Sequence, residues 1–346
     1  MTEGIKRERP AQAARKRRRR IVLISGISVV ALILGTIGVY ALVLSQTFNS
    51  TEKIPEVFPE ETHRPPVLEG EAAKSQNILL LGSDSRDSAH TKLADIVGRT
   101  DTIMVVHIPA DRENVQVMSI MRDSWVDIPG KGESKVNAAM VRGGVPLVVA
   151  TVENLIGARI DHVAIVDFEG FKGITDALGG VTVNNDKAFT SAHKNRYFFP
   201  AGNLELNGEL ALAFVRERAS FPDGDYQRVR NQQKFIKAVM DKTLSRETLT
   251  NPVTISNLVG AVAPFMAVDE GLNSAYAAGL GFEMANIRGD DVTFFTMPTL
   301  GTGMVGSQSI VRVDFDELAV IQGHFRADTL DQYEAKRQSL GGSVEE

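Results

Sequence analysis

The sequence predicts an α/β protein: a three-layer α/β/α domain around a central mixed sheet, preceded by one transmembrane helix. Short apolar runs rich in β-branched residues alternate with helical segments, which is typical of a sheet covered on both faces. An uncharged run of 24 residues, 21–44, precedes all of them. The chain has 346 residues, enough for one large domain with appendages or two modest ones.

The N-terminal region has the pattern of a membrane anchor. Residues 1–20 carry nine Lys or Arg and two Asp or Glu, a charge of +7, so −12 falls on the remainder of a chain whose net charge is −5. The run 21–44 would reach about 36 Å as a helix, more than the ~30 Å of a bilayer core. A basic cluster, Arg15–Arg20, adjoins the run and favours the cytoplasmic side. We therefore expect a cytoplasmic tail (1–20), a single span in the cell membrane (21–44) and an extracellular globular part.

Two alternatives compete for these N-terminal features. A cleaved signal peptide needs a shorter apolar core and a small-residue exit site, and Ala41–Val43 matches such a site poorly. Nucleic-acid binding by the basic cluster is also open. Arginines that abut an apolar span favour the topological role, so we expect no nucleic-acid partner.

The rest of the chain divides into segments of different composition and periodicity. Residues 45–74 contain four prolines and many charges, which predicts an extended extracytoplasmic linker. Residues 75–326 form the expected catalytic domain, and residues 327–346 a flexible C-terminal tail. The predicted strands are 78–81, 102–108, 115–120, 162–166, 181–183 and 292–297. The predicted helices are 145–156, 168–178, 209–214, 226–244, 272–286 and 315–324, with Asn207 and Gly157 as end signals and 184–204 as a polar loop.

Composition excludes several kinds of chemistry. The chain has no cysteine, so disulfides, thiolate nucleophiles and Cys-ligated zinc are absent. Its six histidines show no metal-binding spacing, and His107 lies in an apolar strand where a core role is expected. We find no nucleophile elbow, Walker motif or dinucleotide-binding glycine pattern.

Acidic residues at the ends of two predicted strands form a first candidate site. Asp84 follows one strand, beside Arg86, and Asp101 precedes the next, beside Arg99. If the strands are antiparallel neighbours, both carboxylates emerge at the same sheet edge. Carboxylates of this kind can hold Mg²⁺ together with substrate phosphates. Both could instead be ordinary turn or cap residues.

Basic residues further along the chain form a second candidate site. Arg216 and Arg218 are two apart, so on a strand both would point from one face. Arg228 and Gln232, four apart on a predicted helix, share one helix face and follow Asp225. Such a group requires an anion, and the forked guanidinium suits phosphate. Arg122 and Asp123, at a strand end, form another candidate, for which a salt bridge is the alternative. Lys135, in a loop, could also belong to a site or could simply be solvated.

With these residues in view, the chain resembles the LytR-CpsA-Psr family of cell-envelope proteins. The likeness is strongest over about 77–242 and weaker to about 326. It rests on many blocks in order: 77–86, 99–104, 119–124, 135–139, 160–162, 167–171, 176–181, 215–218 and 223–233.

The resemblance implies a membrane-anchored phosphotransferase. Such an enzyme moves a glycopolymer (teichoic acid, capsule or arabinogalactan) from a polyprenyl-pyrophosphate carrier to peptidoglycan, forming a phosphodiester bond. By the family's motif, Asp84 and Asp101 look like the magnesium site, with Mn²⁺ as an alternative ion. The pyrophosphate clamps look like Arg99, Arg122, Arg216 and Arg218, and the residues that border the head group look like Arg86, Lys135, Asp225, Arg228 and Gln232.

A lipid-linked donor also requires an apolar tunnel between the sheet and its helices. We expect it to be lined by residues such as Ile165, Phe168, Phe171, Leu178, Phe235 and Val239, each of which could instead be an ordinary core residue. Two other functions stay open at this point: a pyrophosphatase that uses water as acceptor, and a non-catalytic envelope scaffold that binds carrier lipid.

Overall fold

The computed structural model describes residues 36, 38–83, 100–192 and 195–339. The chain consists of two compact parts, residues 1–47 and 48–346. In the first part, residue 36 and residues 38–47 are helical, and most of the predicted span 21–44 lies outside the described residues. Among described residues, one helix is long and apolar enough to cross a membrane. That helix is α2 (Ala138–Ile156), which is mostly buried, as expected of a core helix.

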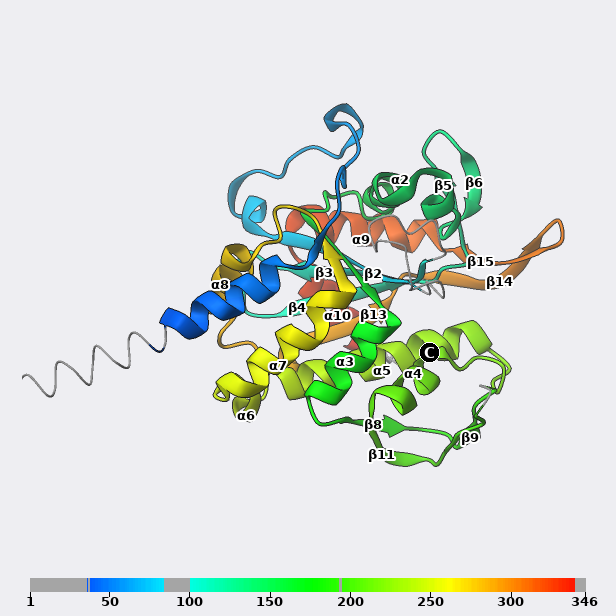
Figure 1. Cartoon of the computed structure of the whole chain (residues 1–346). Coiled ribbons are helices and arrows are strands. Elements are labelled where there is room, and N and C mark those ends of the chain that lie inside the picture. Colours follow the sequence, from blue (N-terminus) through cyan, green and yellow to red (C-terminus); the bar gives the residue numbers. More distant parts are fainter. Residues whose placement is uncertain (1–35, 37, 84–99, 193–194, 340–346) are drawn as a thin grey trace, which may run out of the picture. The chain divides into compact units, whose positions relative to one another are not determined.

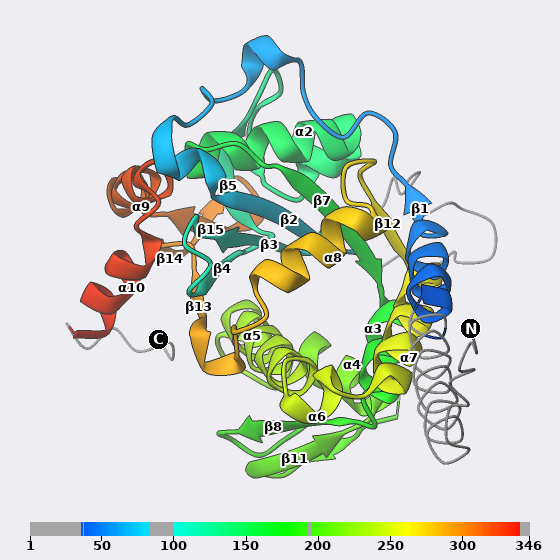
Figure 2. The ribbon, with the colours of Figure 1, turned by 90° about the vertical axis from the view of Figure 1, so that its left-hand side faces the viewer.

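A seven-stranded mixed sheet forms the centre of the second part (Figures 1 and 2), and its strand order is β1-β12-β7-β2-β3-β4-β13. The strands are β1 (Glu52–Lys53), β2 (Gln76–Ser83), β3 (Thr100–Ile108), β4 (Val115–Ile120), β7 (His162–Asp167), β12 (Met266–Val268) and β13 (Val292–Thr296). β2 pairs antiparallel with β3 and parallel with β7. The sequence of β2 is a continuous apolar run because both faces of the sheet are covered at this central strand.

Helices cover both faces of this sheet, so the predicted three-layer domain is confirmed. Figure 2 shows α2 on one side and α5 on the other. The α2 side also carries α9 (Phe315–Ala327) and α10 (Leu330–Ser339). The α5 side carries α3 (Phe168–Ala177), α4 (Gly208–Arg216), α5 (Gly224–Thr243) and α8 (Ser274–Glu283), and α3 packs against α7 (Pro252–Val262), which follows the short α6 (Arg246–Leu249).

Local signals explain several helix ends. The Asn207 side chain accepts a hydrogen bond from the Leu210 N–H and caps α4, as predicted. Gly157 ends α2 with φ 65°, a left-handed conformation that glycine adopts without strain. In the same helix, Gly143 and Gly144 depart from helical angles and set the first turn apart from the remainder.

A second sheet of four strands, β14-β15-β5-β6, was not predicted. It comprises β5 (Ser124–Ile128), β6 (Gly132–Lys135), β14 (Thr299–Val305) and β15 (Gln308–Val313). The hairpin of β14 and β15 extends away from the main sheet (Figure 1). The strands of this second sheet lack the long apolar run from which a central strand is predicted.

Residues 48–74 are not the extended linker that the prolines suggested. β1 pairs with β12, and Ile54 and Val57 are buried in the main core. The Arg64 guanidinium donates to the buried Glu153 carboxylate, with Nη2 to Oε1 at 2.6 Å, and to the Ile160 carbonyl oxygen. The short turns η1 (Glu61–His63) and η2 (Gly70–Lys74) complete a strap across the domain. The sequence did not predict this strap because its few apolar residues are isolated between prolines and show no helix or strand periodicity.

Residues 184–204 are not a polar loop throughout. They contain the end of β8 (Val181–Asn185), β9 (Phe189–Thr190), β10 (Phe198–Phe199) and most of β11 (Gly202–Leu206). Phe189 and Phe199 are buried against Phe214 of α4, with ring centroids 5.7 and 5.5 Å from it. The hairpin thereby builds a second core beneath α4 and α5.

We expected residues 327–346 to form a flexible tail, but the described part of this segment is folded onto the domain. Residues 330–339 form α10, and Leu330 and Tyr333 are buried in the main core. Asp328 holds the start of this segment through His107, whose Nε2 lies 3.0 Å from Oδ1. Burial would raise the pKa of Asp328, but the His107 ring and the Ala110 N–H keep it below the usual value. His107 is therefore a core residue with a partner, as predicted.

Candidate active site

The candidate site begins where β2, β3 and β7 reach one edge of the main sheet. Gly82 pairs with Thr102 and Ser83 with Thr100, so Asp101 occupies a bulge in β3. Ser83 is also paired with Asp167, the last residue of β7. β2 and β3 are antiparallel neighbours, which is the condition under which the residues that follow β2 and begin β3 lie at the same sheet edge. Asp84, Arg86 and Arg99 lie outside the described residues.

Arg122 lies beside this edge, on the turn between β4 and β5. Its Nη1 atom donates to Asp101 Oδ1 at 2.5 Å, and its Nε atom is 3.5 Å from Asp123 Oδ2. Burial would lower the pKa of Arg122, but the hydrogen bond and charge of Asp101 outweigh it and raise the pKa above its usual value. Arg122 is therefore a fixed cation at the sheet edge.

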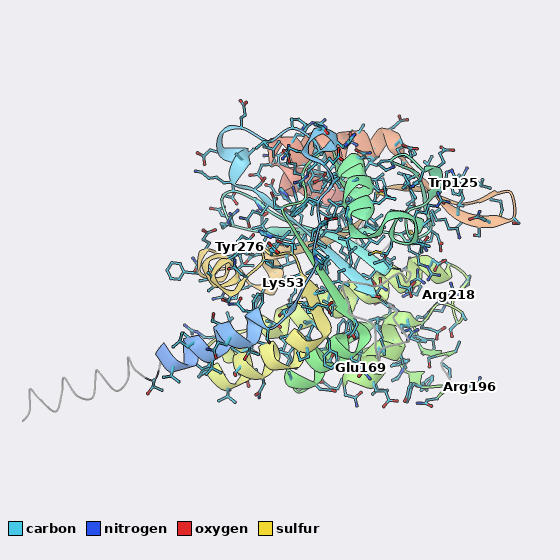
Figure 3. All side chains as sticks on the ribbon, turned by 45° about the horizontal axis from the view of Figure 1, so that its top comes forward. Lys53, Trp125, Glu169, Arg196, Arg218 and Tyr276 are labelled. Carbon is cyan, nitrogen blue, oxygen red and sulfur yellow. The ribbon has the colours of Figure 1, made fainter. Side chains whose placement is uncertain are left out.

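Arg216 and Arg218 do not lie on a strand, contrary to our expectation. Arg216 is the last residue of α4, and the backbone is extended at Glu217. Arg218, which is labelled in Figure 3, follows it. The buried Glu217 carboxylate accepts hydrogen bonds from the backbone N–H groups of Arg218 and Ser220, which fixes the turn. Both arginines nevertheless line the same cavity. The sequence indicated the right residues through the wrong local structure.

α5 brings its polar residues to the same place. One oxygen of Asp225, Oδ1, lies 3.0 Å from Arg228, 3.9 Å from Arg218 and 4.0 Å from Arg122. Three arginines from three segments therefore converge on one carboxylate. Gln232, one turn after Arg228, lines the adjoining cavity.

One donor among the converging arginines is buried and unused. Arg228 is only 7% exposed, and its Nε atom has no hydrogen-bond partner among the described residues. Burial, and then the charge of Arg122, lower the pKa of Arg228 below its usual value. A buried guanidinium with an unused donor is costly unless an anion satisfies it. The arrangement therefore favours an anionic ligand at this point.

An apolar cavity of about 440 Å³ opens behind the arginines, between the sheet and helices α3 and α5. Of the residues expected to line a lipid tunnel, Phe171, Phe235 and Val239 do so. Ile165 belongs to the core on the other face of the sheet, and Leu178 packs into the second core. The side chain of Phe168 lies outside the described part. The cavity is also lined by polar residues at its rim: Asp101, Arg122, Asp167, Arg216, Arg218, Arg228 and Gln232.

A separate polar groove of about 590 Å³ adjoins this cavity, and Arg122 and Arg218 line both. Lys135 and Asp225, predicted as substrate-binding residues, line the groove instead of the cavity. Lys135 Nζ lies 2.9 Å from Asp123 Oδ1, so its charge is paired there.

Comparison with known proteins identifies the family. The LytR_cpsA_psr family model matches residues 39–326. The chain belongs to the LytR-CpsA-Psr family.

Its relatives include the polyisoprenyl-teichoic acid–peptidoglycan teichoic acid transferase TagU of Bacillus mycoides. The two are 37% identical over 218 residues, 62% of this chain and 68% of TagU. The cell wall biosynthesis protein LcpA of Corynebacterium glutamicum is 33% identical, over 73% of this chain and 56% of LcpA. Among solved structures, TagV of B. subtilis has the same fold, with a TM-score of 0.63, 24% identity and coverage of 74% of this chain and 97% of TagV.

The sheet edge of this LytR-CpsA-Psr protein carries several oxygen atoms, the ligand type that Mg²⁺ prefers. Asp101 contributes a carboxylate, and the buried hydroxyls of Ser83 and Thr100 have no hydrogen-bond partner among the described residues. Oxygen ligands of this kind suit Mg²⁺. The described residues include no group of three acidic or histidine side chains able to hold a metal by themselves. Any such site would therefore depend on Asp84 and on ligand phosphates as well.

The sequence analysis missed one acidic residue of the site, Asp167, and expected at most a salt bridge for another, Asp123. Asp167 accepts a hydrogen bond from the Gly170 N–H and caps α3 at the cavity rim, and burial raises its pKa. Its position at the C-terminal end of a strand parallel to β2 could have revealed it. Asp123 joins Arg122 to Lys135, a link that needs the tertiary fold.

Proposed function

We propose that this protein transfers a cell-wall glycopolymer, such as teichoic acid, from a polyprenyl-pyrophosphate carrier to peptidoglycan, forming a phosphodiester bond. The observation that carries the proposal is the apolar cavity rimmed by four arginines: Arg122, Arg216, Arg218 and Arg228. The names of TagU and LcpA, a teichoic acid transferase and a cell wall biosynthesis protein, support the same class of reaction.

The cavity and its rim match the two halves of such a donor. A prenyl chain gains about 0.8 kcal/mol for each CH₂ that it buries, and Phe171, Phe235 and Val239 offer an apolar wall for it. The diphosphate would lie at the rim, where guanidinium groups form paired, charge-assisted hydrogen bonds to its oxygens. Arg228 would supply the buried donor that is otherwise unused.

The reaction requires little covalent chemistry from the protein. An acceptor hydroxyl oxygen bonds to the phosphorus that carries the polymer, and the bond from that phosphorus to the bridging oxygen breaks. Polyprenyl phosphate leaves with the electron pair, and a carboxylate that lines the cavity, such as Asp101, takes the hydroxyl proton. The arginines hold the phosphates in line and stabilise the charge that develops.

We extend the proposal to Mg²⁺, or Mn²⁺ in its place. Asp101, together with Asp84, would hold the ion at the sheet edge. When bound, such an ion would neutralise part of the negative charge of the diphosphate. The arginines would still hold the phosphates in line.

The proposal places the domain at the outer face of the cell membrane. Residues 21–44 would span the bilayer with 1–20 in the cytoplasm, and the domain would begin within a few residues of the lipid surface. That location gives the cavity access to a lipid-linked donor and to peptidoglycan.

Arg228→Ala in the full-length protein tests the proposal. Transfer from a lipid-linked donor to peptidoglycan should fall by roughly 10²–10³ because a preorganised donor to the phosphates is lost. The matched control is Arg230→Ala, two residues along α5, whose guanidinium instead contacts Asp223 and Gln227. The control should retain transfer.

The same assay separates the rival functions. A wild-type protein that releases phosphate from the donor equally well without acceptor would be a pyrophosphatase. One that binds donor without turnover would be a scaffold. Either result, or undiminished transfer by Arg228→Ala, would refute the proposal.

A further inference from the structure

The polar groove beside the cavity has no role in holding a prenyl chain. It is lined by side chains from β6, the start of α2, the α4–α5 connection, α5 and the start of β15. The lining includes Arg122, Val141, Arg142, Arg218, Gln308 and Ser309. Hydroxyl, amide and charged groups of this kind match a ligand rich in hydroxyls.

One wall of the groove depends on the break in α2. Gly144 has φ 65° and ψ −160°, a conformation open to glycine, and it sets the first turn of the helix apart. That turn carries Val141, which is 54% exposed, and Arg142. Arg142 donates to the Lys131 carbonyl oxygen at 3.4 Å and forms no ion pair with a described residue. Its charge is therefore available to a ligand.

The opposite wall comes from the second sheet. Gln308 and Ser309 open β15 and are exposed, whereas the next residue, Ile310, is buried. The groove therefore lies between a helix turn with an apolar face at Val141 and a strand end with amide and hydroxyl groups. Sugar rings present the same combination of an apolar face and polar edges.

The two arginines that line both the cavity and the groove indicate which substrate the groove would bind. Arg122 and Arg218 line both spaces, so a diphosphate at these residues separates the cavity from the groove. In-line displacement requires the nucleophile to approach opposite the leaving group. Because the leaving polyprenyl phosphate is held on the cavity side, the nucleophile must enter from the groove.

We propose that this groove is the subsite for the acceptor glycan, a carboxylate-bearing amino-sugar chain of which one hydroxyl reaches the phosphorus between Arg122 and Arg218. The inference rests on the proposed transfer function. Arg142 would pair with a carboxylate of the acceptor, Gln308 and Ser309 would bond its hydroxyls, and Val141 would contact a ring face.

Arg142→Ala and Gln308→Ala in the full-length protein test this assignment, and Arg246→Ala, an exposed arginine on α6, is the control. Uncross-linked peptidoglycan glycan strands serve as acceptor. We expect KM for these strands to rise about tenfold in Arg142→Ala and less in Gln308→Ala, since a charge-assisted bond is stronger than a neutral one. The KM for the lipid-linked donor and the hydrolysis of donor by water should stay within about twofold.

Two kinetic outcomes overturn the inference. An unchanged KM for the strands in both groove variants would remove the acceptor from the groove. A raised KM for the donor instead would assign the groove to the polymer of the donor.

Direct binding of fluorescent glycan strands keeps the test independent of transfer. If wild type fails to transfer but binds strands tenfold more tightly than Arg142→Ala, the groove assignment stands and the proposed function fails. Equal binding by wild type, Arg142→Ala and Arg246→Ala would overturn the assignment whatever the activity.

Discussion

Arg122 links the acidic and basic halves of the site. It contacts Asp101 at 2.5 Å, approaches Asp123 at 3.5 Å and lies 4.0 Å from Asp225. A planar guanidinium can serve several oxygens at once, whereas an ammonium group is a single point charge. The position therefore requires the shape of arginine as well as its charge.

Arg122→Lys tests that requirement. The variant keeps the charge but loses the fork, so we expect kcat for polymer transfer to fall by about 10²-fold while the domain stays folded. Thermal unfolding should remain within a few degrees of wild type. Arg230→Lys on the surface of α5 is the control, and a lysine variant at 122 with full activity would contradict the role given to the guanidinium fork.

Residue type and the family resemblance together indicated much of the site. Six of the residues that they indicated line one cavity: Asp101, Arg122, Arg216, Arg218, Arg228 and Gln232. The sequence could not divide the cavity from the groove. Lys135 and Asp225 lie in the groove since β6 and the first turn of α5 face that side, and this follows only from the tertiary packing.

The strap of residues 48–74 is an element that matters for stability. Arg64 is 11% exposed and Glu153 only 1%, and the Arg64 guanidinium also lies over the Phe58 ring, 4.6 Å from its centroid. Removing one partner of such a pair leaves a buried charge without compensation, which costs about 3–5 kcal/mol.

Arg64→Ala should therefore lower the free energy of unfolding by about 3–5 kcal/mol, measured by urea unfolding of the full-length protein. The double variant Arg64→Met with Glu153→Met should recover most of the loss, since an apolar pair leaves no buried charge. A change of less than about 0.5 kcal/mol in Arg64→Ala, the size of an exposed pair, would contradict the structural role of the strap.

Periodicity predicted the elements that bury a continuous face, including β2, β3, β4 and β7 of the sheet and α5. It missed β5, β6, β14 and β15, because short strands with exposed residues resemble loops. It also missed the strap and α10, whose few buried side chains gain their partners from distant parts of the chain. Such contacts have no local signal.

The molecule as a whole places two chemically different spaces on either side of one charged rim. The sheet edge formed by β2, β3 and β7 supplies carboxylates. The arginines come from the β4–β5 turn, α4, the α4–α5 connection and α5. The apolar cavity lies on one side of the rim and the polar groove on the other. This arrangement suits a donor with a lipid tail and an acceptor made of sugar.

The central claim is that the cavity behind the arginines holds the prenyl chain of the donor. Photocrosslinking of the full-length protein with a polyprenyl diphosphate that carries a diazirine in its chain tests this most directly. The label should attach to peptides containing Phe171, Phe235 and Val239, and an excess of unlabelled polyprenyl diphosphate should prevent it. Labelling elsewhere on the domain, or labelling of these peptides that the unlabelled lipid does not reduce, would contradict the account.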